Sequence, residues 1–236
     1  MFSETAEYYD IIYSKFKNYD LECEKIIALL DRLKPDTKNI LDVACGTGEH
    51  LKILSQRSDY VLDGLDINPV FVKIAQKKNP KSTLFLDNMT DFKLNKKYDI
   101  VMCLFSSIGY VQTMENVVKT LKNFKTHLNE GGLILVEPWF TPERWNPGMT
   151  YADSAETEDI KIARMSHSDK KGNISIVNFE YLLATKEGIQ HLKETHELGL
   201  FTHQELLSCF KEADLSVEFD SEGLFGRGIY IARSDS

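Results

Sequence analysis

The spacing of apolar residues changes along the chain between a helical period and short, continuous apolar runs. Residues 20–33 carry apolar side chains at helical spacing, and this pattern stops before Pro35, a residue type that ends helices well. From there to residue 139, runs typical of buried strands alternate with amphipathic segments typical of helices. The alternation predicts an α/β fold in which helices cover both faces of a mostly parallel sheet. The expected strands are 39–45, 60–68, 82–88, 98–106 and 133–139, and the expected helices are 49–57, 69–80 and 114–132.

The pattern after Trp145 is different, because apolar and polar residues alternate over longer stretches. Residues 161–185 and 189–201 have the period of two that is typical of strands with one buried face, and the turn residues 169–173 divide the first stretch. We expect these stretches to form a small antiparallel β cap beside the main sheet.

The C-terminal segment predicts a helix followed by a hairpin. Thr202, with Glu205 three residues later, has the form of a capping box, which begins a helix over 202–215. Residues 216–234 then have the pattern of two strands joined by a glycine-rich turn. We therefore expect a core formed by 1–145 and 201–236, with an N-terminal helical lid, and a substrate-binding cap formed by 146–200.

Composition narrows the classes of function. The chain has 236 residues and a formal net charge of -8, which opposes a general affinity for nucleic acid. Its four cysteines are scattered without the C-x-x-C spacing of a zinc site, so we expect reduced thiols and no metal. The sequence has no apolar run of the roughly 18 residues that span a membrane and no visible export signal. We expect a cytoplasmic enzyme that acts on a small molecule without nucleic-acid or membrane partners, with a homodimer as one expected assembly.

Polar residues follow the ends of the first two expected strands. Asp42 precedes a turn that contains Gly46 and Gly48, and Leu51 stands where a dinucleotide-binding turn would have its third glycine. Asp66 ends the next strand, 18 residues beyond Gly48, where a carboxylate can accept hydrogen bonds from both hydroxyls of a ribose. The two glycines allow the backbone to approach a ligand closely. The pattern therefore suits a nucleoside that has no pyrophosphate.

The end of the third expected strand adds another polar position. Asp87 or Asn88 can hydrogen-bond an adenine amine while Met89 packs on the ring. The alternative is a turn in which the asparagine side chain stabilises its own backbone. Because the carboxyl ends of parallel strands meet at one edge of a sheet, the three strand ends together describe an adenosine site.

Several stretches of the chain resemble a known family in their order and spacing. They are "LDVACGTGEH", "DNMTDF", "MCLFSSIGY", "EGGLILVEPWF" and "GRG". Together they resemble the class I S-adenosylmethionine-dependent methyltransferases, which have a Rossmann-like fold. With "RMSHSDKKGN" and "GLFGRGIYI", nearly the whole chain resembles the TDP-amino-sugar N,N-dimethyltransferases of desosamine and mycaminose biosynthesis. The resemblance implies methyl transfer from S-adenosylmethionine to the amino nitrogen of a TDP-linked amino sugar, with an N,N-dimethyl product.

The resemblance also implies roles for individual residues. Lys15 stands where the family has an arginine, and a lysine lacks the bidentate grip of a guanidinium on a carboxylate. Asn88 replaces the family's aspartate, which removes a charge near the adenine. The implied cofactor contacts are Asp42, Ala44, Gly46 and Gly48 for the methionine part, Asp66 for the ribose, Asn88 and Met89 for the adenine, Leu104 beside the sulfonium, and Tyr13 and Lys15 near the N-terminus.

Methyl transfer to an amine needs little acid–base chemistry, because positioning and desolvation supply most of the acceleration. Tyr9 and Tyr110 are the expected catalytic groups near the nitrogen, and the alternative for each is a tyrosine of the core. His167 is a candidate base, but a histidine on an alternating strand is more often structural. The residues expected to bind the nucleotide-linked sugar are Trp139, Ser166, His167 and Arg227.

Other classes fit parts of the pattern. A nicotinamide-dependent oxidoreductase would share Asp66 but would have a third glycine in the turn. A non-catalytic module that binds S-adenosylmethionine would keep the strand-end residues and lack a substrate cavity. Within the methyltransferases, the alternative acceptor is another small-molecule amine or a hydroxyl.

Overall fold

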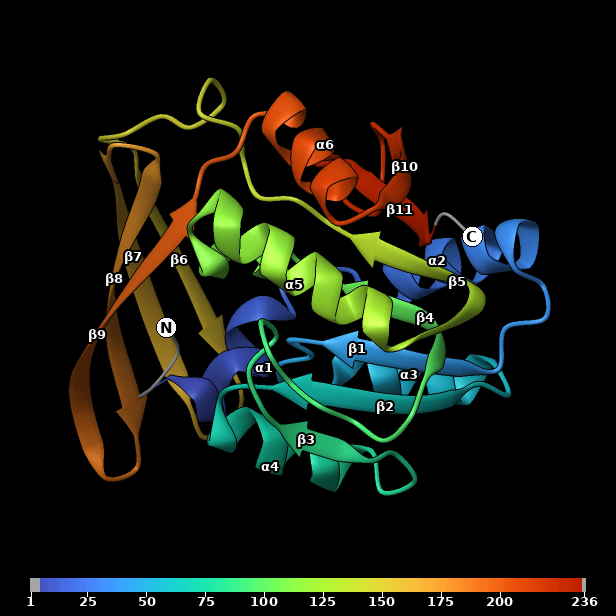
Figure 1. Cartoon of the computed structure of the whole chain (residues 1–236). Coiled ribbons are helices and arrows are strands. Elements are labelled where there is room, and N and C mark those ends of the chain that lie inside the picture. Colours follow the sequence, from blue (N-terminus) through green and yellow to red (C-terminus); the bar gives the residue numbers. More distant parts are fainter. Residues whose placement is uncertain (1–4, 235–236) are drawn as a thin grey trace.

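The computed structural model describes residues 5–234, and its larger sheet has seven strands (Figure 1). The strand order is β10-β11-β5-β4-β1-β2-β3. Strands β1 to β5 are parallel, β11 is antiparallel to β5, and β10 is antiparallel to β11. The predicted mostly parallel sheet is therefore confirmed. The strands are β1 Asn39–Val43, β2 Val61–Asp66, β3 Leu84–Leu86, β4 Tyr98–Cys103, β5 Leu128–Val136, β10 Leu215–Asp220 and β11 Ile229–Ser234.

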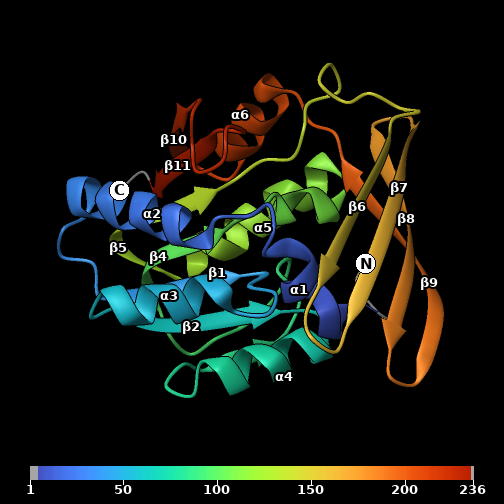
Figure 2. The ribbon, with the colours of Figure 1, turned by 180° about the vertical axis from the view of Figure 1, so that it is seen from behind.

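Helices cover both faces of this sheet, which Figures 1 and 2 show from opposite sides. They are α2 (Tyr19–Leu33), α3 (Glu49–Arg57), α4 (Pro69–Lys78), α5 (Met114–Thr126) and α6 (His203–Glu212). Helices α2 and α3 bury apolar residues such as Ile26 and Leu54 against one face. Helices α5 and α6 bury Leu121 and Phe210 against the other face. The sheet is thus enclosed by two apolar cores.

Polar residues before four helices determine where these helices begin. The side chains of Asn18, Asn68 and Thr113 accept hydrogen bonds from backbone N–H groups in the first turns of α2, α4 and α5. Thr202 and Glu205 form the predicted capping box at the start of α6. These caps satisfy N–H groups that have no partner within the helix. Local sequence therefore explains where these four helices begin.

Two elements differ from the predicted pattern. The helix expected over 114–132 ends at Thr126, and the residues after it belong to β5. Gly131 has a φ of 66°, a left-handed conformation that an α-helix cannot contain. Strand β6 (Thr150–Glu156) was not predicted, because its only buried residue is Ala155 and it therefore lacks the alternation of a half-buried strand.

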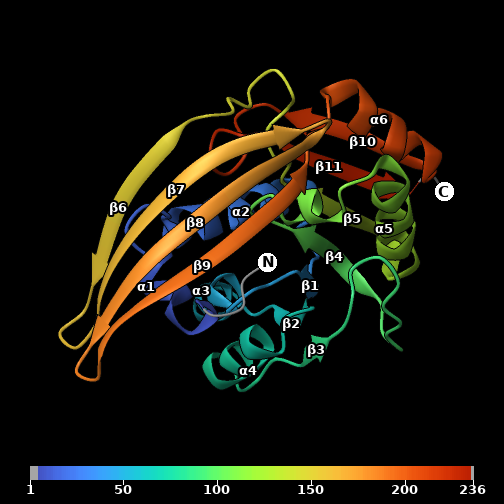
Figure 3. The same ribbon diagram turned by 90° about the vertical axis from the view of Figure 1, so that its left-hand side faces the viewer.

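The cap is a four-stranded antiparallel sheet in the order β6-β7-β8-β9. Figure 3 shows its long strands arching over the N-terminal helix, and Figure 1 places it at the carboxyl ends of the parallel strands. All four strands lie within the range 146–200 that the sequence predicts for the cap. That residues 146–200 form a separate substrate-binding part stays a prediction. The remaining strands are β7 Lys161–Lys171, β8 Ile174–Thr185 and β9 Gly188–Gly199.

The N-terminal segment lies between the cap and α4 (Figures 1 and 2). It consists of a short 3-10 helix, η1 (Ala6–Tyr8), and α1 (Tyr9–Tyr13). A third apolar cluster joins Tyr9 to Phe71 of α4 and to Tyr181 of the cap. The segment, which we call the lid, is therefore packed against both parts of the molecule.

No helix within residues 5–234 is long and apolar enough to cross a membrane. Over the same part of the chain, no group of three or more histidine, cysteine, aspartate or glutamate residues could hold a metal ion.

Candidate active site

The loop after β1 has left-handed backbone conformations at alternate residues. The φ angles are 59° at Ala44, 57° at Gly46 and 74° at Gly48. A Cβ atom on Gly46 would meet nothing within 4 Å, so the backbone there borders open space. A Cβ atom on Gly48 would lie 2.6 Å from the Asn79 side chain. Gly46 thus leaves room for a ligand, whereas Gly48 allows α3 to pack closely on α4.

Asp66 is fixed at the end of β2 by backbone donors. The N–H groups of Gly46 and Asn68 donate to its two carboxylate oxygens at 2.9 and 2.8 Å. Burial raises the pKa of Asp66, and the backbone hydrogen bonds oppose that shift. Asn68 also faces the cavity, although the sequence did not single it out. A carboxylate held in this way is suited to receive ribose hydroxyls.

Asp42 is almost fully buried at the end of β1, with 1% of its surface exposed. Its Oδ2 atom has no hydrogen-bond partner among the residues that the structure describes. Burial, with a smaller contribution from the charge of Asp66, raises the pKa of Asp42 to about 8. A small cavity of about 40 Å³ lies beside it and is also lined by Leu104 and Ala44. A buried carboxyl oxygen without a partner can be satisfied by a cationic donor, so this site fits the amino group of S-adenosylmethionine.

Lys17, rather than Lys15, lies at this end of the site. Lys15 is exposed, and its Nζ donates to the backbone oxygen of Ser154 in β6 at 2.6 Å. Lys17 is buried, and its Nζ lies 2.6 Å from Glu22 Oε2 and 3.9 Å from the centre of the Phe105 ring. Burial lowers the pKa of Lys17. The sequence contains both lysines in "SKFKNY", and only the packing distinguishes them.

The lid is attached to the cofactor loop by polar contacts that we call the latch. Asp10 of α1 accepts a hydrogen bond from Thr47 Oγ1 at 2.6 Å. Lys78 at the end of α4 lies 2.5 Å from Asp10 and 2.7 Å from Glu49. The latch joins three segments that are distant in the sequence and holds the lid over the loop.

The chain turns sharply after β4, where Phe105 and Ser106 have φ angles of 50° and 63°. Left-handed conformations in such residues are strained and require support from the surroundings. The Phe105 N–H donates to Glu137 Oε2 at 2.7 Å, and the Ser106 hydroxyl donates to the Pro138 carbonyl at 2.6 Å. The turn leads directly to Tyr110, which lines the cavity.

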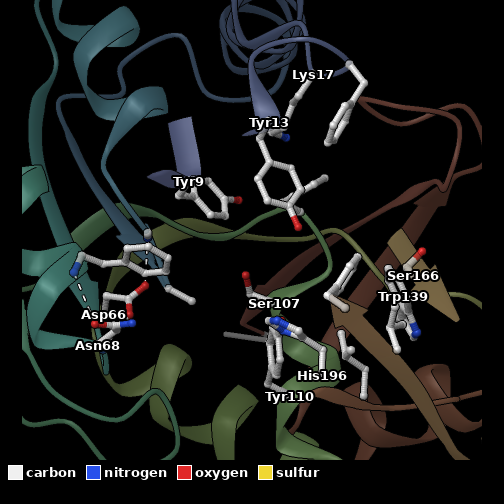
Figure 4. A pocket seen from close by; sticks show the side chains of 18 of the residues that line it. Tyr9, Tyr13, Lys17, Asp66, Asn68, Ser107, Tyr110, Trp139, Ser166 and His196 are labelled. Atoms are coloured by element: carbon white, nitrogen blue, oxygen red, sulfur yellow. Dashed lines mark hydrogen bonds between the residues drawn. The ribbon is translucent and has the colours of Figure 1, made fainter. Parts of the chain in front are cut away.

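A cavity of about 650 Å³ lies between the strand ends, the lid and the cap. Figure 4 shows Tyr9 and Tyr13 reaching into it from the lid, with Asp66 on one side and Trp139 on another. This volume is within the range of small-molecule sites. Two of the predicted residues, Asp42 and Leu104, line the smaller cavity. The predicted residues that line the cavity of about 650 Å³ are Tyr9, Tyr13, Ala44, Gly46, Asp66, Met89, Tyr110, Trp139, Ser166 and Arg227.

Four predicted site residues do not line either cavity: Lys15, Gly48, Asn88 and His167. Asn88 Oδ1 accepts from the N–H and the hydroxyl of Thr90 at 3.0 and 3.1 Å, which is the turn alternative. His167 is exposed, because alternation along β7 directs Ser166 toward the cavity and its neighbour to the outer face.

Two guanidinium groups line the cavity and differ in their partners. Arg164 of β7 is ion-paired with Asp153, with Nη2 2.6 Å from Oδ2. Arg227 donates to the neutral Ser106 hydroxyl at 2.8 Å, and its guanidinium carbon lies 5.4 Å from the centre of the Trp139 ring. Burial lowers the pKa of Arg227, which nevertheless stays charged at neutral pH. Arg227 is therefore the cation that is better placed to receive an anionic group.

Known proteins resemble this chain along its length. The family described as "Methyltransferase domain" matches residues 40–132. A dTDP-3-amino-3,6-dideoxy-alpha-D-glucopyranose N,N-dimethyltransferase from Streptomyces fradiae is 37% identical over 96% of this chain and 89% of its own length. A dTDP-3-amino-3,4,6-trideoxy-alpha-D-glucopyranose N,N-dimethyltransferase from Streptomyces venezuelae is 34% identical over 96% of both chains.

Solved structures agree with these sequence relatives. The crystal structure of Streptomyces venezuelae DesVI aligns with a TM-score of 0.92 and 32% identity over 100% of both chains. S-adenosylmethionine-bound CalS10, an amino pentose methyltransferase from Micromonospora echinaspora, aligns with a TM-score of 0.85 and 27% identity over 98% of this chain and 97% of its own. The expected class I fold, methyltransferase activity and S-adenosylmethionine cofactor are confirmed. The chain belongs to the family of S-adenosylmethionine-dependent N,N-dimethyltransferases of nucleotide-linked amino sugars.

Proposed function

We propose that this enzyme transfers a methyl group from S-adenosylmethionine to the amino nitrogen of a dTDP-linked amino sugar and that the final product is the N,N-dimethyl sugar. The observation that carries the proposal is the cavity of about 650 Å³ between the strand-end carboxylates and the cap. Its Asp66 end suits the cofactor, and its Arg227 end suits a phosphorylated acceptor. The named substrates of the relatives from the two Streptomyces species support the same substrate class.

The cofactor site uses charge and shape at the strand ends. Asp66 accepts the ribose hydroxyls, Met89 packs on the adenine, and Asp42 receives the amino group of the methionine part. Lys17 provides the positive charge that the family's arginine would provide. Leu104 forms an apolar wall beside the sulfur. S-adenosylmethionine, when bound, supplies a methyl group on a sulfonium cation.

Tyr9 and Tyr110 hold the acceptor nitrogen. Both tyrosines line the cavity, and burial raises the pKa of each hydroxyl, so that both stay protonated at neutral pH. A neutral hydroxyl can accept a hydrogen bond from an amine without competing for the methyl group. Tyr9 stacks on Tyr13 with 4.3 Å between ring centres, and the two rings exclude water from this side of the cavity.

The nucleotide part of the acceptor lies toward the cap and the C-terminal hairpin. Arg227 binds phosphate oxygens, for which a guanidinium has the matching fork of donors. Trp139 packs on the base or the sugar, and its ring orientation is fixed because Nε1 donates to Ser175 Oγ at 2.8 Å. Ser166 adds a hydroxyl on the cap side of the cavity. Because they do not line the cavities, Lys15, Gly48, Asn88 and His167 are not included in this site.

The test is methylation of a panel of acceptors by the purified enzyme. The panel contains dTDP-linked 3-amino and 4-amino sugars, free amino acids, simple amines and simple alcohols, and mass spectrometry reports the number of methyl groups added. We expect successive mono- and dimethylation of at least one dTDP-amino sugar. Turnover of another amine or of a hydroxyl, without turnover of any dTDP-amino sugar, would favour the alternative small-molecule acceptor and refute the proposal.

The cytoplasmic location and the homodimer stay predictions from the sequence. Cell fractionation checks the location, and light scattering on the purified enzyme checks the oligomeric state. The absence of nucleic-acid partners likewise stays a prediction.

A further inference from the structure

Three polar side chains, Tyr110, His196 and Glu194, form a chain of contacts that begins at the cavity. The Tyr110 hydroxyl, on the short helix η2 (Ser107–Val111), lies 2.7 Å from His196 Nδ1 of β9. His196 Nε2 lies 3.5 Å from Glu194 Oε2. Glu194 is held in turn by the N–H and the hydroxyl of Thr5, at 3.2 and 2.7 Å. Tyr110 and His196 both line the cavity, and Figure 4 shows them side by side.

The protonation states along this chain follow from burial. Burial raises the pKa of Tyr110, so its hydroxyl keeps its proton at neutral pH. Burial lowers the pKa of His196 below the ordinary 6.5, so the ring is neutral. The Tyr110 hydroxyl then donates to Nδ1, and the Nε2 proton faces Glu194. This arrangement leaves a lone pair of the Tyr110 oxygen for a donor in the cavity.

We propose that Tyr110, His196 and Glu194 form a proton relay that deprotonates the substrate ammonium before each methyl transfer; this rests on the proposed function. The ammonium gives a proton to the Tyr110 oxygen while the Tyr110 proton moves to His196 Nδ1. The products are a neutral amine with a free electron pair, an unchanged tyrosine and an imidazolium. Glu194 is a positioning residue that orients the ring and stabilises its positive charge. The proton returns to solvent after the product leaves.

A relay of this kind would let the enzyme use the protonated form of the amine. An amine near carbons that bear oxygen resembles an α-amino group, with a pKa of about 8, so most of it is protonated at neutral pH. A site that accepts only the neutral amine would leave this major form unused. Dimethylation requires the removal of one proton for each methyl group, so the relay acts twice for each product.

Burial is the main reason that the His196 ring is neutral before the substrate arrives. Arg164 of β7 adds to the lowering of the His196 pKa, and Glu194 opposes it. Phe179 of β8 packs edge-on against the ring, with 5.4 Å between centres, and excludes water from it. The titratable and charged groups that face His196 and Tyr110 from the surrounding elements are Glu194, Arg164, Tyr13, Tyr181 and Asp66.

The pH profile of kcat/KM tests the relay through Tyr110→Phe and His196→Asn. The wild-type profile should stay nearly flat from pH 8.5 down to pH 6.5, because His196 accepts the proton within the complex. In each variant only the neutral amine reacts, so kcat/KM should fall about 25-fold between pH 8.5 and pH 6.5 for an amine with a pKa near 8. At pH 9 the variants and the wild type should differ much less.

Glu194 and a second tyrosine–histidine pair provide controls. In Glu194→Gln, kcat/KM should fall more steeply with decreasing pH than in the wild type. Glu194→Asp should restore part of the flat pH profile of kcat/KM. Tyr230 and His203 form a second tyrosine–histidine hydrogen bond of the same 2.7 Å length, and neither residue lines the cavity. Tyr230→Phe removes this hydrogen bond and should leave the pH profile of kcat/KM unchanged. Calorimetry with S-adenosylmethionine tests whether each variant retains a folded cofactor site.

The outcomes separate the two proposals. If the wild type dimethylates a dTDP-amino sugar but Tyr110→Phe and His196→Asn keep its flat profile, the relay is refuted and the proposed function stands. If the wild type methylates none of these sugars, the proposed function is refuted. A variant that loses cofactor binding is replaced by Tyr110→His or His196→Gln. The fall of kcat/KM between pH 8.5 and pH 6.5 in the replacement is then compared with that of the wild type to test the relay.

Discussion

Replacing Asp42 with asparagine should remove most of the pH dependence of S-adenosylmethionine binding. In the empty site, burial and the charge of Asp66 raise the pKa of Asp42 to about 8. The carboxyl is therefore mostly neutral at pH 7. The positively charged amino group of the cofactor favours the ionised carboxylate, so binding releases a proton.

The size of this effect follows from the two pKa values. If the cofactor returns Asp42 from a pKa of about 8 to its ordinary 3.8, the affinity should rise about 50-fold between pH 6 and pH 8. Close to one proton should be released per cofactor bound at pH 6. The contribution of Asp42 to the stability of the unliganded protein has the opposite trend: it is fully present below pH 3.8 and is lost as the pH rises through about 8. Asp42→Asn should thus raise Tm of the unliganded enzyme at pH 8 while weakening cofactor binding.

Isothermal titration calorimetry at pH 6, 7 and 8, in two buffers with different ionisation enthalpies, measures both the affinity and the number of protons released. Asp63→Asn is the matched control, because Asp63 is a buried carboxylate on the neighbouring strand that accepts from the Tyr98 hydroxyl and pairs with Lys96. It should change Tm without changing the proton release. The reasoning fails if Asp42→Asn binds the cofactor with the wild-type pH slope and proton count.

Three further substitutions separate cofactor binding, acceptor binding and stability. Asp66→Ala should raise the Kd of S-adenosylmethionine about 100-fold or more, because hydrogen bonds to a charged group contribute about 1.5–3 kcal/mol each; an unchanged Kd by calorimetry contradicts the assigned ribose site. Arg227→Lys should raise the KM of the sugar nucleotide about tenfold and leave the Kd of the cofactor unchanged, since a lysine cannot bind phosphate oxygens through a planar fork. Initial rates measure the KM, and equal values for both enzymes would remove Arg227 from the acceptor site. Thr202→Ala should lower the free energy of unfolding by about 1 kcal/mol through loss of the capping box, with kcat/KM unchanged. Urea titration measures the loss, and no change would show that the cap is energetically neutral.

Local signals predicted most of the core. Helix α4 follows the capping residue Asn68 and begins with Pro69, so two adjacent residues determine where it starts. Asp42 lies just before the glycine turn and Asp66 ends the next apolar run, and a parallel sheet brings these strand ends together whatever the details of packing. The end of α5 was the exception, because a helical pattern and a following glycine-rich strand share apolar residues around Leu128.

The site residues that were missed depend on contacts between distant segments. The alternating pattern of β7 gives the period of its side chains but does not say which face packs on the cavity, so Ser166 and His167 could not be distinguished. Glu194 and His196 share a face of β9 with the apolar Leu198, a signal that polar side chains occupy a buried face. Their partner Tyr110 lies 86 residues from His196, which no local pattern links to it.

The latch formed by Asp10, Thr47, Glu49 and Lys78 holds the lid over the cofactor loop, and we expect it to affect how two methyl groups reach one nitrogen. Dimethylation consumes two cofactors, so the spent cofactor must be exchanged between the two transfers. The latch closes the cofactor end through partly exposed side chains, with 39% of Asp10 and 20% of Lys78 accessible, and such pairs contribute little stability. Tyr9 and Tyr13 of the same lid also line the acceptor side of the cavity and pack against Tyr181 of the cap. Opening of the lid therefore uncovers the cofactor and the acceptor together, and we expect a stronger latch to keep the monomethyl sugar bound for longer and to shift the enzyme toward processive dimethylation.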